Sequence, residues 1–258
     1  MGDLPASPAV RWRIRRLEDV DSTNRLVLDE ARAGAEPGLV VVADQQHAGR
    51  GRRGRVWTAP SGSSLLVSVL LRPALVAEQL HVITMAAALS LLEAVRAVAG
   101  FAAELKWPND LVVGDRKLAG LLAEADLSAA GAVRAVVVGV GCNVTWGGYP
   151  AELELIATAC DREAGHAVER DALLGAFLDR FAARLDALDM VPGDYRARLA
   201  TIGRPVRVEF ADGELEGVAT DVDEVGRLVV RRTDGATTMV AAGDVVHLRP
   251  LTDRRSAR

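Results

Sequence analysis

The chain has 258 residues, half of them apolar, and its 31 basic and 35 acidic side chains give a formal net charge of −4. This length is enough for one well-buried domain with about 50 residues left for a small second one, and the apolar share excludes disorder throughout. The acidic balance argues against a general nucleic-acid binder, because such domains are usually basic. The two cysteines are too few for the disulfide framework of a small secreted domain, and they favour a reducing compartment.

The N-terminal residues lack the basic and apolar regions of a signal peptide. No uninterrupted apolar run approaches the roughly 18 residues that a membrane helix needs. We therefore expect a cytoplasmic protein without a membrane segment.

The first half of the chain alternates short strands and helices around one long loop. Strands are predicted at residues 12–17, 39–43 and 64–71, a helix from the capping residues 21–24 to about Ala33, and a long apolar helix over 78–98. Residues 44–63 follow neither a helical nor a strand period. Loops of this length in a compact domain are usually functional.

The second half begins with short strands and ends in closely spaced β-rich runs separated by turns. Strands are predicted at 104–107, 111–113 and 117–125, a central sheet strand at 135–144, and an amphipathic helix on the stripe Leu173, Leu174, Phe177, Leu178, Phe181, Leu185 and Leu188. From residue 203 onward, β-rich runs at 206–210, 228–232, 237–240 and 245–248 alternate with glycine turns. Such spacing is typical of a small β-barrel.

Together these elements predict an α+β fold, with a mixed β-sheet domain packed with helices and a small C-terminal β-barrel. We expect residues 1–20 to form an N-terminal extension and the first strand, and residues 21–200 the main domain. The barrel should cover residues 201–250, and residues 251–258 should form a frayed tail.

The long loop carries the sequence GRGRRGR at residues 49–55. Residues 49–54 match GxGxxG, but Trp57 and Pro60 follow where a dinucleotide-binding fold would open a helix, and no Walker Lys-Ser or Lys-Thr follows. What remains is a set of arginines on a glycine-rich backbone, which can close around a phosphate or carboxylate. A solvated basic loop or an Arg-Gly nucleic-acid segment is the alternative.

Of the 31 basic residues only two are lysine, Lys106 and Lys117. Either this is chance, or the two positions need a compact ammonium that a planar guanidinium cannot replace. The short strands around KWPND would bring Lys106, Asp110 and Lys117 together in a mixed-charge cluster that suits a triphosphate with its metal. A plain hairpin corner is the alternative.

Asn143 ends the predicted central strand, where its amide could contact a base or ribose or satisfy a turn. The four histidines, His47, His81, His166 and His247, show no metal-ligand spacing, and no GxSxG motif occurs. A zinc site and nucleophilic hydrolysis therefore have no support in the sequence.

DSTN at residues 21–24, the GRGRRGR loop, KWPND, RKLAGLLAE and VGVGCN follow in an order that resembles biotin protein ligases. The resemblance is specific over roughly residues 21–144 and less distinct to Arg249. It implies formation of biotinyl-5′-AMP from biotin and ATP with Mg²⁺, then transfer of biotin to one lysine of the carboxyl carrier domain of a biotin-dependent carboxylase. Residues 21–200 would be the catalytic biotin- and ATP-binding domain, and residues 201–250 a Src-homology-like barrel.

The resemblance also implies roles for individual residues. Biotin contacts would come from Ser22, Thr23, Gln46, Gly49, Arg50, Arg52, Trp57, Lys117 and Gly120. ATP contacts would come from Arg52, Arg53, Arg55, Lys106, Asn109, Asp110, Lys117 and Asn143. Lys117, Arg50 and Arg52 would be the catalytic cations, and Asp110 would be the residue nearest the magnesium of Mg-ATP.

Some members of this family carry an N-terminal winged helix and repress transcription, but only 20 residues precede Asp21 here. We therefore expect no nucleic-acid partner, and either a monomer or a homodimer. A lipoate or octanoate transferase would share the fold, although the polar Gln46 and the arginine loop suit a urea ring better than a plain acyl chain. A non-enzymatic nucleic-acid module is the other alternative.

Overall fold

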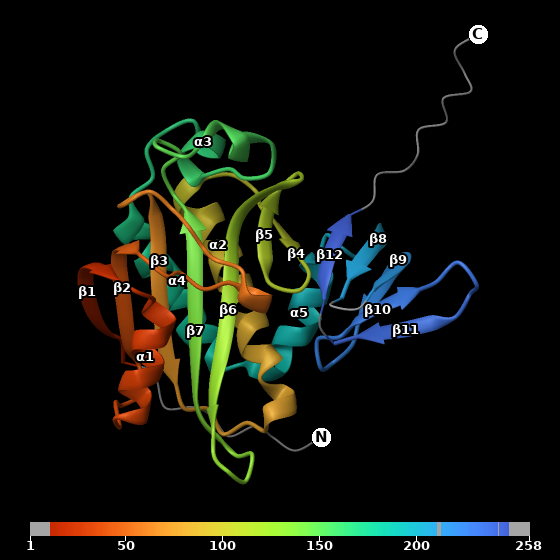
Figure 1. Ribbon diagram of the computed structural model, residues 1–258, viewed down its shortest axis with the longest axis horizontal. Helices are drawn as coiled ribbons and strands as arrows, with labels where there is room; N and C mark the ends of the chain where they lie inside the picture. Colours follow the sequence, from red (N-terminus) through yellow and green to blue (C-terminus); the bar gives the residue numbers. More distant parts are fainter. Residues whose placement is uncertain (1–10, 211–212, 242, 248–258) are drawn as a thin grey trace.

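The computed structural model describes residues 11–210, 213–241 and 243–247. Two β-sheets and a set of helices make up this part of the chain (Figure 1), so the α+β prediction is confirmed. The predicted extension before residue 11 and the predicted tail at 251–258 lie outside the described residues.

The larger sheet has seven strands and contains both parallel and antiparallel pairs. In spatial order the strands are β1 (Arg13–Val20), β2 (Leu39–Gln46), β3 (Ser64–Leu71), β7 (Val133–Asn143), β6 (Arg116–Leu127), β5 (Asp110–Val113) and β4 (Glu104–Lys106). β1 and β2 pair in parallel, and every other neighbouring pair is antiparallel. The β-branched run that forms β7 lies at the centre, as its composition predicted.

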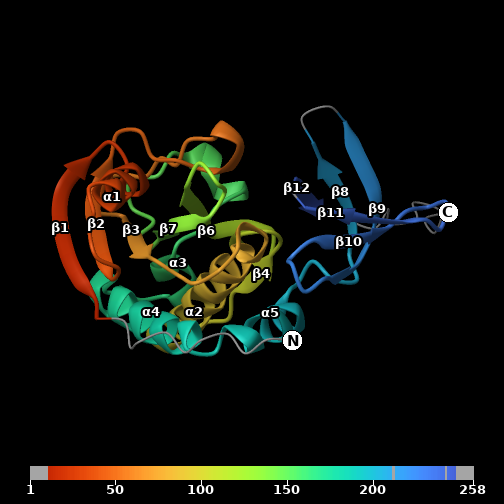
Figure 2. The same ribbon diagram turned by 90° about the horizontal axis from the view of Figure 1, so that it is seen from below.

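Helices cover the two faces of this sheet unequally (Figure 2). They are α1 (Thr23–Arg32), α2 (His81–Ala99), α3 (Cys160–Ala164), α4 (Arg170–Leu185) and α5 (Val191–Arg198). α1 alone packs on one face, where Val27 and Leu28 contact the cluster that includes Val137 of β7. α2 and α4 pack on the opposite face in the main core, with Phe177 and Phe181 stacked at 5.4 Å between ring centroids.

Ser22 caps α1, and this sets where the helix begins. Its backbone is extended (φ −155°, ψ 128°), and its Oγ accepts a hydrogen bond from the Arg25 amide at 3.5 Å. The cap places Thr23 and Asn24, both buried, in the first turn, directly above the large sheet. The predicted helix start is therefore confirmed.

Apolar composition over the α2 region exceeds what we expected from the sequence. Residues Ala77–Ala99 are long and apolar enough to cross a membrane, with a mean hydropathy of 1.8 in the most apolar window. However, 67% of that window is buried inside the protein, where α2 packs against α4 and the sheet. The expectation that no segment approaches such a composition was wrong, and the segment is a core helix.

Residues beyond α5 form a second, antiparallel sheet of five strands. In spatial order these are β11 (Thr237–Val240), β10 (Leu228–Arg231), β9 (Glu214–Val222), β8 (Pro205–Glu209) and β12 (Asp244–His247). The sequence did not predict β9, because Glu214, Glu216 and Asp221 interrupt its apolar pattern. The short helices α3 and α5 were missed as well, and residues 44–46 extend β2 into the segment expected to be loop.

The second sheet is attached to the large one through the KWPND segment. The Trp107 amide donates to Thr201 Oγ1 at 3.0 Å, and His247 of β12 lies with its Nε2 3.1 Å from the same hydroxyl. Trp107 Nε1 also donates to the Gly226 carbonyl at 2.9 Å. Burial, together with the nearby positive charges of Lys106 and Arg204, lowers the pKa of His247 to about 4. The residues between β4 and β5 are therefore held by the C-terminal sheet.

Candidate active site

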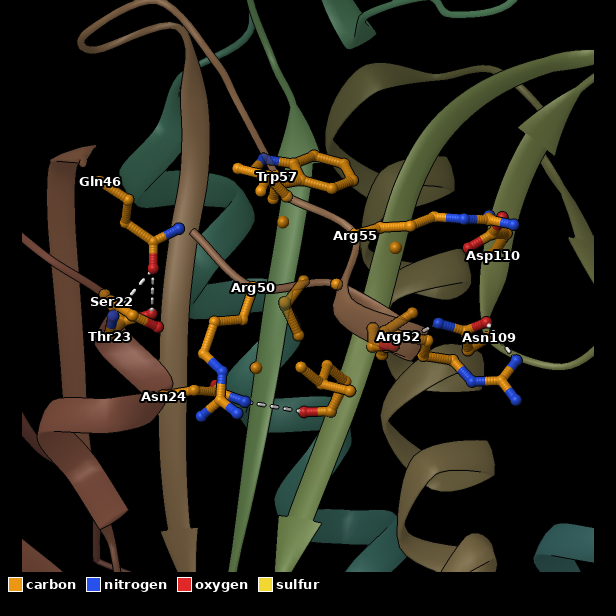
Figure 3. Close-up of a pocket in the computed structure, with 18 of the residues that line it drawn as sticks. Ser22, Thr23, Asn24, Gln46, Arg50, Arg52, Arg55, Trp57, Asn109 and Asp110 are labelled. Carbon is orange, nitrogen blue, oxygen red and sulfur yellow. Dashed lines mark hydrogen bonds between the residues drawn. The ribbon is translucent and has the colours of Figure 1, made fainter. Parts of the chain in front are cut away.

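A cavity of about 130 Å³ opens on the α1 face of the large sheet, beside the first turn of that helix (Figure 3). Its walls come from α1, the arginine loop and strands β5, β6 and β7. Most of the predicted site residues line it: Ser22, Thr23, Gln46, Arg50, Arg52, Arg55, Trp57, Asn109, Asp110, Lys117 and Gly120. Segments far apart in the sequence therefore meet at one place.

Glycines on β6 and β7 form the floor of this cavity. Gly120 and Gly141 are cross-strand partners, and the Trp57 indole lies on both. A Cβ atom added at Gly141 would lie 2.6 Å from Trp57 Cε2, and one at Gly139 would lie 2.1 Å from Asn24 Oδ1. Both positions must lack a side chain for Trp57 and Asn24 to lie where they do.

One end of the cavity presents neutral hydrogen-bonding groups from the start of α1 and the end of β2. The Thr23 amide and hydroxyl donate to Gln46 Oε1 at 2.8 Å and 3.0 Å. This fixes the orientation of the Gln46 amide and leaves its Nε2 group as a donor. Ser22 and Thr23 are only 2% and 4% exposed, so this end suits a neutral polar ring.

The opposite end is cationic. Lys117 Nζ lies 2.7 Å from Asp110 Oδ1 and 5.6 Å from the centre of the Trp57 ring. Lys106 pairs in register with Asp110, and burial lowers the pKa of its ammonium, an effect that the Asp110 charge opposes. The structure thus brings Lys106, Asp110 and Lys117 together, as the spacing of the short strands predicted, although only Asp110 and Lys117 line the cavity.

The arginine loop closes on itself as a tight hairpin. The Trp57 amide donates to the Gly49 carbonyl at 3.0 Å, and the Gly51 amide donates to the Arg55 carbonyl at 2.7 Å. A Cβ at Gly49 would lie 2.3 Å from the Trp57 carbonyl oxygen, so this glycine supports the position of Trp57 from outside the cavity lining.

Two arginines attach this hairpin to its surroundings. Arg52 Nη1 donates to Asn109 Oδ1 and to the Gly243 carbonyl, each at 3.3 Å, and Arg53 Nη1 donates to the Glu209 carbonyl at 2.7 Å. Asn109 in turn donates to the Leu121 carbonyl of β6. The loop is therefore in contact with both sheets, and Arg53 lies outside the cavity lining.

Asn143 is buried beyond the floor and does not line the cavity. Its Nδ2 donates to the Thr158 carbonyl at 2.9 Å, and its Oδ1 accepts from the Tyr149 hydroxyl, also at 2.9 Å. Burial raises the pKa of Tyr149, so that hydroxyl stays a donor. The amide holds residues 156–158, which run beside Lys117 through backbone hydrogen bonds of 2.8 Å and 2.9 Å.

The sequence left two residues near the cavity without a role. Asn24 lines the cavity, but the sequence indicated only that it could cap a helix. Glu124, the last residue of the RKLAGLLAE motif, lies 2.9 Å from Arg50, and the sequence indicated no role for it. Leu155 and Ile156 beside Lys117 are 85% and 61% exposed. No local pattern marked Asn24 or Glu124, because the two residues are each other's partners across 100 positions of the sequence.

Within the described ranges, no group of three or more histidine, cysteine, aspartate or glutamate side chains could hold a metal ion. Asp110 alone faces the cationic end, and it is already paired with Lys117. A metal at this end would therefore have to bring most of its own ligands.

Comparison with known proteins places the chain in a family. Residues 17–143 match the model of the biotin/lipoate A/B protein ligase family, and residues 201–248 match that of the biotin protein ligase C-terminal domain. The biotin–[acetyl-CoA-carboxylase] ligase of Mycobacterium tuberculosis is 40% identical over 249 residues, covering 92% of this chain and 90% of that protein. The chain belongs to the biotin protein ligase family.

Other biotin protein ligases agree with this placement. The biotin–[acetyl-CoA-carboxylase] ligase of Paracoccus denitrificans is 36% identical over 88% of this chain and 97% of its own length. The biotin protein ligase of Aquifex aeolicus, solved in complex with biotin and ATP, matches with a TM-score of 0.77 at 27% identity, over 92% of this chain and 99% of that one. The Leishmania major biotin protein ligase in complex with biotinyl-5-AMP, at 23% identity and a TM-score of 0.60, shares the fold over 89% and 98% of the two chains.

We predict that the glycine floor is needed to hold the Trp57 indole in place. We expect Gly141→Ala to push the Trp57 indole off β7, because the new methyl group overlaps its ring, and to destabilise the protein by about 1–3 kcal/mol, as overpacking does. In a ¹H–¹⁵N spectrum the Trp57 Nε1–H signal, assigned with Trp57→Phe, should move while the other three indole signals stay.

Gly175→Ala is the matched control, because this helical glycine has no atom within 4 Å of an added Cβ. It should leave all four indole signals in place. A Trp57 signal unchanged by Gly141→Ala would show that the indole does not rest on this floor.

Proposed function

We propose that this chain activates biotin with ATP to biotinyl-5′-AMP and then transfers biotin to a specific lysine of the carrier domain of a biotin-dependent carboxylase. The observation that supports this most strongly is the cavity with two unlike ends. Neutral hydrogen-bonding groups lie at one end and cations at the other, on a floor without side chains. Biotin has the same polarity, with a neutral urea ring at one end and a carboxylate at the other.

At the neutral end, Ser22, Thr23 and Gln46 would bind the fused rings of biotin. Gln46 Nε2 is a donor for the urea carbonyl, because Gln46 Oε1 is occupied by Thr23. The indole of Trp57 would cover the apolar part of the ligand, and Gly120 would let the ligand approach the β6 backbone. The unpartnered, buried Trp57 Nε1 gives this ring one further donor.

The first reaction step joins two anions. The biotin carboxylate attacks the α-phosphorus of ATP, the bond to the β-phosphate oxygen breaks, and pyrophosphate leaves. Repulsion between the carboxylate and the phosphates is the main obstacle, so preorganised positive charge at Lys117, Arg50 and Arg52 is the largest available contribution. The Lys117 ammonium donates in any direction and can therefore follow the charge from carboxylate to phosphate.

The second step transfers the biotinyl group from the mixed anhydride to the acceptor lysine, and AMP leaves. The attacking amine must be neutral, and we propose that Asp110, a carboxylate that lines the cationic end, accepts its proton. The closed hairpin at residues 49–57 would keep water from the anhydride, which would otherwise hydrolyse.

ATP would lie at the cationic end. We propose that Arg52, Arg53, Arg55, Lys106 and Asn109 contact its phosphates directly or through the closed loop. Magnesium would enter bound to the nucleotide, with Asp110 as its nearest carboxylate. We propose that Asn143 contacts the adenine and also positions residues 156–158, whose exposed apolar side chains could cover the base.

We also propose a division into a catalytic domain at residues 21–200, preceded by a first strand within residues 1–20, and a small C-terminal barrel at residues 201–250. The separate family matches at residues 17–143 and 201–248 support this division. The partner would be the carrier domain and not a nucleic acid, since the chain has a net charge of −4. We place the reaction in the cytoplasm, with the enzyme acting as a monomer or a homodimer.

Incubation of the purified protein with α-labelled ATP and either biotin or lipoate tests this function. We expect labelled biotinyl-AMP and an equal amount of pyrophosphate with biotin, and little acyl-adenylate with lipoate, since a plain acyl chain leaves Gln46 without a partner. An adenylate formed only with lipoate, or with neither acid, would contradict the proposal.

We expect Lys117→Arg to lower single-turnover formation of biotinyl-AMP by about 100-fold or more, because a misplaced charged group loses this much even when its charge is kept. The planar fork can face the carboxylate or the phosphate but not both. Thermal melting should be nearly unchanged, because Lys117 is partly exposed.

Lys106→Arg is the matched control, since it makes the same change outside the cavity lining. It should mainly raise the KM for ATP, by a few-fold. If Lys117→Arg retains adenylation within a few-fold of the parent, then Lys117 is only one positive charge among several.

A further inference from the structure

Glu124 of β6 has both carboxylate oxygens occupied by side chains of the candidate site. Its Oε1 lies 2.9 Å from Arg50 Nη1, on the arginine loop, and its Oε2 accepts from Asn24 Nδ2, also at 2.9 Å. The Glu124 side chain is 20% exposed and that of Arg50 46%, so solvent screens this ion pair only in part. One carboxylate therefore joins the loop to the first turn of α1.

Asn24 has no freedom to turn away from Glu124. Its Nδ2 also donates to the Leu122 carbonyl at 3.2 Å, and its Oδ1 accepts from the Ser68 hydroxyl at 2.6 Å. Ser68, Gly139 and Leu122 are cross-strand neighbours on β3, β7 and β6, so the amide lies across three adjacent strands. The missing Cβ of Gly139 leaves the space that it fills.

The same network continues to the neutral end of the cavity. Ser68 Oγ is 2.7 Å from Thr23 Oγ1, which is 3.0 Å from Gln46 Oε1. A chain of polar contacts thus runs from Gln46 to Arg50, and Glu124 is its charged member. Removing that charge loosens Arg50 without removing any of the groups proposed to touch biotin.

We infer that Glu124 is a positioning residue, which holds Arg50 and its loop over the cavity through one carboxylate shared with Asn24. This inference rests on the proposed function and deepens it. An Arg50 already held in place needs less ordering when the carboxylate of biotin arrives, and this favours binding more than the chemical step.

Steady-state kinetics of Glu124→Gln test the inference. We expect the KM for biotin to rise about tenfold, the loss typical of one charge-assisted contact, while kcat changes less than about threefold. Because Glu124 acts through Arg50, the double variant Arg50→Ala/Glu124→Gln should stay within about twofold of Arg50→Ala alone. Glu124→Asp, which withdraws the charge by one methylene group, should change KM in the same direction and serves if the amide variant does not fold.

Asp126→Asn is the matched control. Asp126 is two residues further along β6, forms an ion pair with Arg32 at 3.3 Å and does not line the cavity. Its KM and kcat should stay within about twofold of the parent, because neither Asp126 nor Arg32 lines the cavity. An unchanged KM in Glu124→Gln, or losses that multiply in the double variant, would overturn the inference.

Limited digestion with trypsin, with no substrate present, separates this inference from the proposed function. Cleavage after Arg50, Arg52, Arg53 or Arg55, mapped by mass spectrometry, should be at least about threefold faster in Glu124→Gln than in the parent or in Asp126→Asn, because the loop opens more often. If the parent makes no biotinyl-AMP, the proposed function fails, and equal cleavage rates would overturn the role of Glu124 on their own.

Discussion

Three glycines on β6 and β7, Gly120, Gly139 and Gly141, are the constraint on which the rest of the site depends. The Trp57 indole can lie this close to the sheet only because its neighbours Gly120 and Gly141, a cross-strand pair, lack side chains. Asn24 can reach across three strands only because Gly139 has no Cβ. The central strand of a sheet is normally filled with large apolar residues, and β7 has them on its other face, against α2 and α4. On the α1 face, β7 has Ala135 and Val137 in the cluster with α1 and Gly139 and Gly141 at the site.

Charge is arranged around this floor in matched pairs. Lys117 is paired with Asp110, and Arg50 is paired with Glu124. Each carboxylate limits the repulsion between neighbouring cations and keeps its partner in place before any anion arrives. The carboxylate and phosphates of the proposed substrates would then compete with fixed partners, so that binding and loop closure become linked.

Much of this could be predicted from the sequence where the signal is local. Residues 21–24 were predicted to cap a helix, and the short strands around KWPND predicted that Lys106, Asp110 and Lys117 would meet. Gly120 was expected at the site from the resemblance, but Glu124, Gly139 and Gly141 were not, because alternation along a strand does not say which face will meet α1. The contacts of Arg52 and Arg53 with the C-terminal sheet were invisible for the same reason, since their partners are more than 150 positions away. β9 was missed because its charged residues hide its period.

The cavity is smaller than the proposed ligand requires. About 130 Å³ is well below the roughly 300 Å³ of the smallest usual ligand sites. The cavity must therefore enlarge when biotinyl-AMP binds. We expect the indole of Trp57, which covers Gly120 and Gly141, to leave the glycine floor. A crystal structure of the protein with biotinyl-AMP tests this directly. We predict the ligand over Gly120 and Gly141, with the Trp57 ring lifted and packed against it. A bound adenylate elsewhere, with the ring still on Gly141, would contradict the account.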